Sequence, residues 1–311
     1  MIEVQNLAKD YGSYHAVRGI SFDVHGGEVV GFLGPNGAGK STTMKMLTCY
    51  LAPTAGIARV GGVDVGADPL AVRQQLGYLP EDTPIYPEMT TLEFLEFVAA
   101  MRRIPTDRRR KRIRDVAEVC GLFSVMGKLV GELSKGYRQR AGLAQALVHD
   151  PAILILDEPT SGLDPNQIVE IRQLIREIGR EKTVILSTHI LPEVQATCSR
   201  VIIIHEGRLV ADGTPGELSA QEGEHAYRLL VEAVGLSREQ VTEKLQAIQG
   251  VKSVSEVDGD DGALGLMVAG ESSRDLRRDL FACARDNGWI LLELKRQTLS
   301  LEDVFRKLTR E

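Results

Sequence analysis

Three short runs of apolar residues stand out along the chain: Val29 to Leu33, Ile153 to Leu156 and Val184 to Ser187. Each run is nearly continuous rather than alternating, which is the pattern of parallel strands covered on both faces. A loop and then a stretch with helical periodicity follow each run. Repeated strand–loop–helix order predicts an α/β layer structure with a mixed or parallel core sheet.

Two other regions have different patterns. Residues 2–24 alternate between apolar and polar positions, which predicts antiparallel strands with turns near residues 10–13 and 25–27. Between residues 89 and 147 the periodicity becomes helical, and Thr90 with Glu93 has the spacing of a capping box. We therefore expect an antiparallel β subdomain and a helical subdomain inserted between two core strands.

The composition changes after residue 213, where the sequence GTPGELSAQEGE predicts a linker at residues 219–226. The preceding 1–218 and the following 227–311 are expected to be separate domains. In the second domain the order is strand, helix, strand, strand, helix, strand and a last helix, which predicts a small α+β domain with a ferredoxin-like βαββαβ order. The expected strands are Tyr227–Val234, Val251–Val257, Ala263–Val268 and Trp289–Leu294, and the helices start at Ser237, Ser272 and Ser300, each followed at capping-box spacing by Gln240, Asp275 or Asp303.

The amino-acid composition limits the classes of function that the chain can have. The 311 residues carry 37 Lys and Arg against 43 Asp and Glu, a net charge of −6, whereas a dedicated nucleic-acid binder usually has a basic domain. No apolar run approaches the roughly 20 residues of a membrane span, so we expect any membrane role to depend on a partner. The cysteines are scattered, which fits a reducing cytosol: Cys49, Cys120, Cys198 and Cys283.

Residues 34–41 read GPNGAGKS, the G-x-x-x-x-G-K-S pattern of a P-loop, between a predicted strand and a predicted helix. The glycines let successive backbone N–H groups turn toward phosphate, and the helix adds its positive N-terminal end. Lys40 supplies a charge for the β- and γ-phosphates, and the Ser41 hydroxyl can bind Mg²⁺. The alternative is a glycine-rich turn that matches by chance. The expected nucleotide contacts are Gly34, Pro35, Asn36, Gly37, Ala38, Gly39, Lys40, Ser41 and Thr42.

The second apolar run ends in an acidic pair, since residues 152–159 read AILILDEP. Asp157 is placed to bind Mg²⁺, directly or through water. Glu158 is placed to act as a general base that activates a water. The alternative is two surface carboxylates at a strand end, but the P-loop in the same chain favours a hydrolytic site.

Four more motifs then appear in order, and with them the sequence resembles the nucleotide-binding subunit of ABC transporters over about residues 1–218. They are KDYG with Tyr11, LSKGYRQR at residues 133–140, SGLDP at residues 161–165 and LSTHI at residues 186–190. In the family these correspond to the adenine-stacking aromatic, the signature, the D-loop and the switch histidine. The ending SLEDVFRKLT is similar to the appended domain of exporter-type ATPases for drug, gliding-motility and nitrous-oxide-reductase-linked systems.

The resemblance implies that two such subunits pair head to tail, as a homodimer or a heterodimer, with each ATP between the P-loop of one and the signature of the other. Ser134 and Gly136 would then contact the γ-phosphate across the interface. His189 would contact it within the subunit, and Tyr11 would stack on adenine. Ordinary structural roles stay open for three residues. His189 could be a hydrogen-bonded histidine at a strand end, Tyr11 an aromatic residue in a turn, and Asp164 of the D-loop a helix N-cap.

The sequence departs from the family pattern at two motifs. Lys135 and Tyr137 stand where the signature commonly has Gly and Gln, although Ser134 and the second glycine are kept. Glu81 in YLPE stands at the glutamine of the Q-loop. A carboxylate there can also bind Mg²⁺, and the alternative is an ordinary loop acid.

The function expected from these patterns is Mg²⁺-dependent ATP hydrolysis that powers transport, with export favoured, through a separate transmembrane permease. The subunit would be cytoplasmic and peripheral on the inner face of the membrane, with no nucleic acid as partner. One alternative is a soluble ABC-type ATPase acting on nucleic acid or ribosomes, but the chain has one cassette, and about 90 residues without sustained heptads separate P-loop and signature. The other is a nucleotide-gated regulator, against which Glu158 and His189 argue.

Overall fold

The computed structural model describes residues 1–311 except 222–224, 233–236, 260–262, 271–274, 298–300 and 310–311. Backbone contacts divide the chain into two compact units, with the boundary after Pro215. Each unit has its own buried apolar cluster. The two are therefore described separately.

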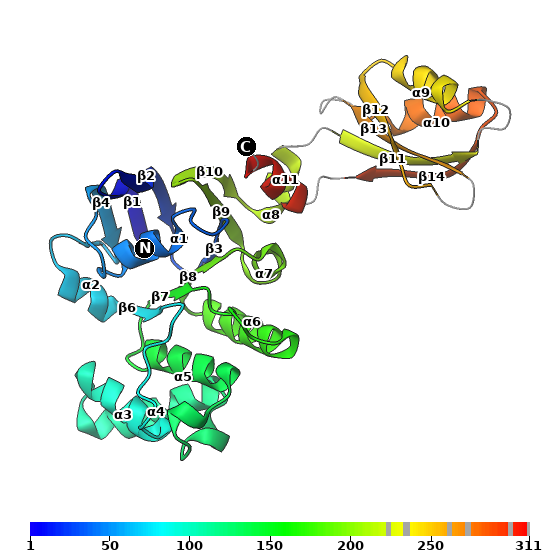
Figure 1. Cartoon of the computed structure of the whole chain (residues 1–311). Helices are drawn as coiled ribbons and strands as arrows, with labels where there is room; N and C mark the ends of the chain where they lie inside the picture. The colour runs from blue at the N-terminus through cyan, green and yellow to red at the C-terminus, as the bar shows by residue number, and fades with distance from the viewer. Residues whose placement is uncertain (222–224, 233–236, 260–262, 271–274, 298–300, 310–311) are drawn as a thin grey trace. The chain divides into compact units, whose positions relative to one another are not determined.

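A six-stranded sheet in the order β10-β9-β3-β8-β7-β6 forms the centre of the first unit (Figure 1). All neighbouring pairs are parallel except β9 with β10, so the predicted mixed, mainly parallel core sheet is confirmed. Every residue of β7 and β8 is buried, as continuous apolar runs require. The strands are β3 (Val29–Leu33), β6 (Leu76–Leu79), β7 (Ile153–Asp157), β8 (Thr183–Thr188), β9 (Arg200–His205) and β10 (Arg208–Gly213).

The alternating region near the N-terminus forms an antiparallel sheet in the order β2-β1-β4-β5, as predicted. Its apolar side packs against the core sheet, where the rings of Phe22 and Phe32 lie 5.6 Å apart between centroids. Helices α1 and α7 contact the core strands. The elements are β1 (Ile2–Tyr11), β2 (Tyr14–Val24), β4 (Ala55–Val60), β5 (Val63–Asp64), α1 (Lys40–Leu47), α2 (Pro69–Gln75), α6 (Pro165–Gly179) and α7 (Leu191–Thr197).

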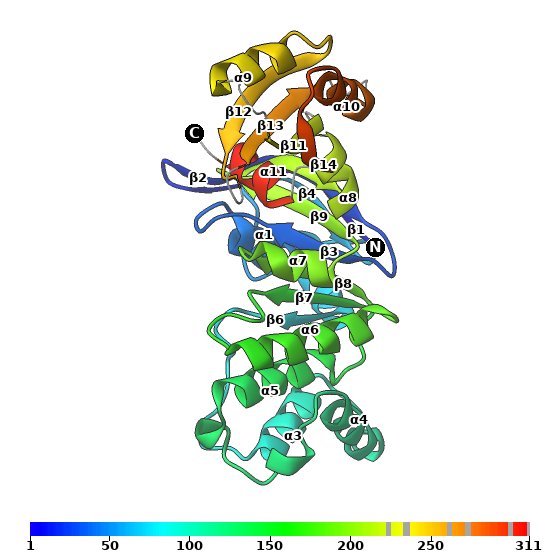
Figure 2. The same ribbon diagram turned by 90° about the vertical axis from the view of Figure 1, so that its right-hand side faces the viewer.

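The predicted helical insertion lies between β6 and β7 and packs as a group beyond the β6 edge of the sheet (Figure 2). The capping box at its start is present, with the Thr90 hydroxyl accepting from the backbone of Glu93 while the Glu93 carboxylate accepts from the backbone of Thr90. The helices are α3 (Thr91–Met101), α4 (Thr106–Val119) and α5 (Lys135–Leu147), with short 3₁₀ turns at Phe123–Val125 and Val130–Glu132.

The second unit contains a four-stranded antiparallel sheet in the order β12-β13-β11-β14, with α9 and α10 on one face. Element order and strand order are those of a ferredoxin-like βαββαβ unit. Its core includes Tyr227, whose hydroxyl accepts the backbone N–H of Leu276 at 2.9 Å. The elements are α8 (Pro215–Gln221), β11 (His225–Glu232), α9 (Arg238–Gln246), β12 (Val251–Val257), β13 (Leu264–Gly270), α10 (Arg277–Asp286), β14 (Ile290–Gln297) and α11 (Leu301–Leu308).

Some boundaries in this unit differ from the predicted ones. Part of the expected linker at 219–226 belongs to α8 and β11, because Pro215 begins a helix in the way that proline favours at a first helical position. The predicted cap Ser237 is confirmed with its partner Gln240. Helix α10 is preceded by Leu276, and the Asp275 carboxylate accepts the N–H of Arg277 instead of completing a capping box. Ser272 and Ser300 lie outside the described residues.

None of the helices in the described part of the chain combines the length and apolar character that crossing a bilayer requires.

Candidate functional site

The P-loop connects β3 to α1, and its glycines are required by close backbone approaches. A Cβ on Gly34 would lie 2.4 Å from the carbonyl oxygen of Ile204, and one on Gly39 would lie 2.6 Å from that of Ala16. Gly37 and Gly39 also have φ angles of 79° and 106°. An L side chain would strain the loop at these positions. The sequence therefore folds residues 34–39 into a tight turn that leads directly into the N-terminus of α1.

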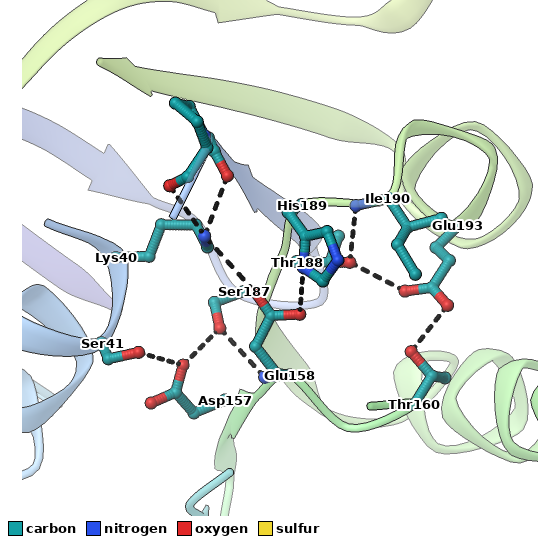
Figure 3. A network of polar contacts seen from close by, with 12 residues as sticks. Lys40, Ser41, Asp157, Glu158, Thr160, Ser187, Thr188, His189, Ile190 and Glu193 are labelled. Carbon is teal, nitrogen blue, oxygen red and sulfur yellow. Dashed lines mark hydrogen bonds and ion pairs between the residues drawn. The ribbon is translucent and has the colours of Figure 1, made fainter. Parts of the chain in front are cut away.

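The Lys40 side chain is only 6% exposed, and oxygen atoms surround its ammonium group. Its Nζ donates to the carbonyl oxygens of Gly34 at 2.8 Å and Pro35 at 3.2 Å, and forms an ion pair with Oε1 of Glu158 at 3.3 Å (Figure 3). A buried ammonium needs such partners. An incoming phosphate can replace them, so Lys40 is held ready for an anion.

Asp157 ends β7 and is 1% exposed. Its Oδ1 accepts from the hydroxyl of Ser41 at 3.0 Å and from that of Ser187 at 2.5 Å. These carboxylate and hydroxyl oxygens are hard ligands of the kind that Mg²⁺ takes, usually from one or two carboxylates together with substrate phosphates. The donors fit that ion. Ser187, which sequence reasoning left without a role, fixes the carboxylate from β8.

Glu158 and His189 meet at the ends of β7 and β8. Oε2 of Glu158 lies 3.0 Å from Nδ1 of His189. The backbone N–H of Glu158 lies 3.0 Å from the hydroxyl of Ser187, to which it donates. Glu158 has φ +47°, a conformation that a non-glycine residue rarely adopts and that is common at functional sites. The fold thus holds this carboxylate in a strained position beside both Lys40 and the imidazole.

A cavity of about 470 Å³ lies over these groups. The sequence predicted its lining in part and missed Tyr14, whose hydroxyl lies 3.4 Å from the carbonyl oxygen of Gly37. The only available signal was that Tyr14 is a second tyrosine across the turn from Tyr11; both side chains are exposed. The predicted site residues that line it are Tyr11, Asn36, Gly37, Gly39, Lys40, Ser41, Thr42, Glu81, Glu158 and His189.

Glu81 also lines a neighbouring cavity of about 470 Å³, together with Ser41, Asp157 and Tyr78. The carboxylate can therefore face Ser41 and Asp157 from the loop after β6. Burial, and then the nearby charge of Asp157, raises the pKa of the Tyr78 phenol, which remains a neutral hydroxyl near neutral pH.

The predicted signature residues Ser134 and Gly136 and the D-loop residue Asp164 lie outside this cavity. Ser134 caps α5 by accepting the N–H of Tyr137 at 3.3 Å, and Asp164 caps α6 by accepting that of Gln167 at 3.0 Å. The helix-cap alternative for Asp164 is thereby confirmed. Neither these two nor Gly136 belongs to the described lining of the P-loop cavity. Ser134 and Asp164 are exposed, so they are available to a second molecule.

Comparisons with known proteins agree with this geometry. The family described as ABC transporter matches residues 17–161. A second, overlapping match covers residues 130–194 and is described as an AAA domain, putative AbiEii toxin, of a type IV toxin–antitoxin system.

The chain is similar to the uncharacterized ABC transporter ATP-binding protein YxlF of Bacillus subtilis (strain 168), with 33% identity over 308 residues that cover 99% of each chain. It is 39% identical over 222 residues to Nod factor export ATP-binding protein I of Paraburkholderia xenovorans (strain LB400), covering 71% of this chain and 73% of that protein. Among solved structures, the dimeric post-hydrolysis ATP-binding cassette MJ0796 bound to ADP and Pi is similar with a TM-score of 0.63 and 25% identity, covering 69% of this chain and 98% of that one.

Proposed function

The chain belongs to the ATP-binding proteins of ABC transporters, and we propose that it uses the site around Lys40, Asp157 and Glu158 to hydrolyse Mg-ATP and drive export through a separate transmembrane permease. ATP binding and hydrolysis are properties of the family. The observation that carries the assignment of residues is the convergence of Lys40, Ser41, Asp157, Glu158 and His189 beside the P-loop.

The roles follow from charge and position. Lys40 binds the β- and γ-phosphates with the backbone N–H groups of residues 36–42. Ser41 and Asp157 would hold Mg²⁺, and Glu81, which lines the same cavity, would be a further ligand. Mg²⁺, when bound, neutralises charge that develops on the phosphates. Glu158 accepts a proton from the attacking water, and His189 orients that water and the γ-phosphate.

The adenine would lie against Tyr11 on the exposed side of the cavity. Tyr14 is close enough to the P-loop backbone to enclose the same ligand. Stacking on a tyrosine face contributes about 1–3 kcal/mol for a nucleobase.

We propose that a second ATP-binding subunit, either another copy or a relative, completes the site with Ser134, Gly136 and Asp164. These residues lie at the starts of α5 and α6, where helix N-termini favour anions. The exposure of Ser134 and Asp164, and the position of all three outside the P-loop cavity of the same molecule, support a contribution in trans. The dimeric MJ0796 cassette offers a precedent.

The permease would be a different polypeptide, which would place this chain at the cytoplasmic face of the membrane. Export is favoured by the similarity to a Nod factor export protein and by the C-terminal ending. Action on nucleic acid has no comparable support, since the similarity to a transporter subunit extends over 99% of the chain.

The decisive experiment measures ATPase activity and molecular mass of the full chain and of Glu158→Gln with Mg-ATP. We expect hydrolysis by the variant to fall by about 10²–10⁴-fold, the range that a general base supplies. We also expect the variant to accumulate as a nucleotide-dependent dimer in size-exclusion chromatography with light scattering. Glu170→Gln, on an exposed face of α6, is the matched control. Hydrolysis by Glu158→Gln at the wild-type rate would reject the assigned base.

A further inference from the structure

Glu193 is a buried carboxylate that the roles above leave unexplained. It lies in the first turn of α7, four residues after His189, and is 2% exposed. Its Oε1 accepts from the hydroxyl of Thr160 at 2.6 Å, and its Oε2 accepts from that of Thr188 at 2.8 Å (Figure 3). A carboxylate is buried at high energetic cost unless such partners are present.

A cation from another helix completes the environment of this carboxylate. Nη2 of Arg172 on α6 lies 3.5 Å from Oε1 of Glu193. Among the described residues, no hydrogen-bond partner reaches the buried Nε of Arg172, so the guanidinium depends strongly on this ion pair. Glu193 therefore connects α6, α7, the turn that carries Thr160 and the end of β8 that carries Thr188.

The two threonines lie next to the proposed catalytic pair. Thr160 is two residues after Glu158, and Thr188 directly precedes His189. The Thr188 hydroxyl also accepts the N–H of Ile190 at 3.0 Å, so the backbone on both sides of His189 is fixed. Because Glu158 and His189 contact each other at 3.0 Å, the contacts form a closed ring that passes through Glu193.

We infer that Glu193 is a positioning residue for ATP hydrolysis, which sets the distance between Glu158 and His189 by holding the turn after Glu158 and the strand end before His189. This inference rests on the proposed function. Glu193 is not among the residues that line the P-loop cavity, so it acts through Thr160 and Thr188 rather than on ATP. A displacement of about 1 Å in a reacting group can lower a rate by about 10²-fold.

A purely structural role would have a different signature. The matched control is Thr183→Val, because Thr183 lies on the same strand as Thr188, is equally buried and accepts the N–H of Gly27 at 2.9 Å. Both Thr→Val changes remove one buried hydroxyl of the same size. Of the two changes, only Thr188→Val removes a contact from the closed ring of contacts that includes His189.

The test measures kcat and ATP affinity of the full chain for wild type, Glu193→Ala, Glu193→Gln, Thr188→Val and Thr183→Val. We expect kcat of Glu193→Ala to fall by about 10- to 100-fold while the affinity for ATP stays within about twofold, since the phosphate contacts are intact. Glu193→Gln should recover part of kcat, because its amide can still hydrogen-bond to both threonines. Thr188→Val should lose kcat and Thr183→Val should keep it.

A double mutant separates positioning from general loss of stability. If Glu193 sets the distance between Glu158 and His189, Glu193→Ala should lower the single-turnover rate less in a His189→Ala background than in the wild type. Multiplicative losses would overturn the inference, as would equal kcat values in Thr188→Val and Thr183→Val. Thr188→Val and Thr183→Val also test the inference if Glu193→Ala does not fold. A wild-type chain without ATPase activity would reject the proposed function, whereas an active wild type with a fully active Glu193→Ala would reject this inference alone.

Discussion

The ion pair between Lys40 and Glu158 makes a prediction about the nucleotide-free protein. Both side chains are buried, and Nζ of Lys40 lies 3.3 Å from Oε1 of Glu158. Glu158→Gln removes the only negative charge that the described residues place within ion-pair distance of this ammonium. The free variant should therefore be less stable than the wild type, apart from any effect on hydrolysis.

The expected loss of stability depends on the hydrogen-bond partners that Lys40 keeps in the variant. Removing one member of a buried ion pair costs about 3–5 kcal/mol. Here the glutamine oxygen and two carbonyl oxygens still accept from Lys40, and the site opens to a cavity, so we expect a loss of about 2 kcal/mol. For a unit of this size that corresponds to a decrease in Tm of about 4–8 °C. Phosphate replaces Glu158 at Lys40, so the same energy should return as tighter ATP binding, up to about 30-fold.

Thermal unfolding of the nucleotide-free proteins and equilibrium titration with ATP test both parts. The matched control is Glu170→Gln, which removes a carboxylate 2.6 Å from Nη2 of Arg140 but with the Glu170 side chain 58% exposed. Exposed pairs contribute about 0–1 kcal/mol, so its Tm should change little. A Tm and ATP affinity of Glu158→Gln equal to those of the wild type would refute the reasoning, and so would an equal decrease in both variants.

Two further predictions concern single groups. Glu81→Gln should change ATP affinity by less than about fivefold, because an exposed charge contributes about 1 kcal/mol or less. The same change should alter the activation of ATPase by the permease. Equal activation of wild type and variant would contradict this. Burial, and then the charge of Arg102, lowers the pKa of His149 from 6.5 to about 4. As pH falls, the unfolded chain therefore binds a proton at this histidine before the folded chain does, so the free energy of unfolding should decrease between about pH 6.5 and pH 4. Measured by urea unfolding, His149→Gln should show a weaker decrease. Equal pH slopes in wild type and variant would refute this prediction.

Much of the core could be predicted because its signals are local. The continuous apolar runs at 29–33, 153–156 and 184–187 correspond to β3, β7 and β8, and the glycine pattern marks the turn between β3 and α1. The capping boxes at Thr90 and Ser237 also depend on residues three positions apart. Such patterns determine an element without reference to the rest of the chain.

Element ends were less predictable where the same composition allows two local structures. The sequence PGELSAQ contains turn residues, yet Pro215 begins a helix. Near α10, the Asp275 carboxylate bonds to Arg277 two residues on, and this short-range contact competes with the predicted capping box. In both cases the sequence identifies an element boundary, but competing local contacts decide on which side of it each residue lies.

The missed site residues show why a motif alone is an incomplete description. Ser187 reaches Asp157 from a neighbouring strand, and Glu193 reaches Thr160 across 33 positions of sequence, so neither contact has a local spacing. Both support Glu158 in a backbone conformation that is unfavourable for a glutamate. Strain of this kind persists only where surrounding contacts outweigh it. The proposed general base and the side chains that hold it should therefore be treated as one unit, in which we expect the rate to depend on hydrogen bonds that no linear motif records.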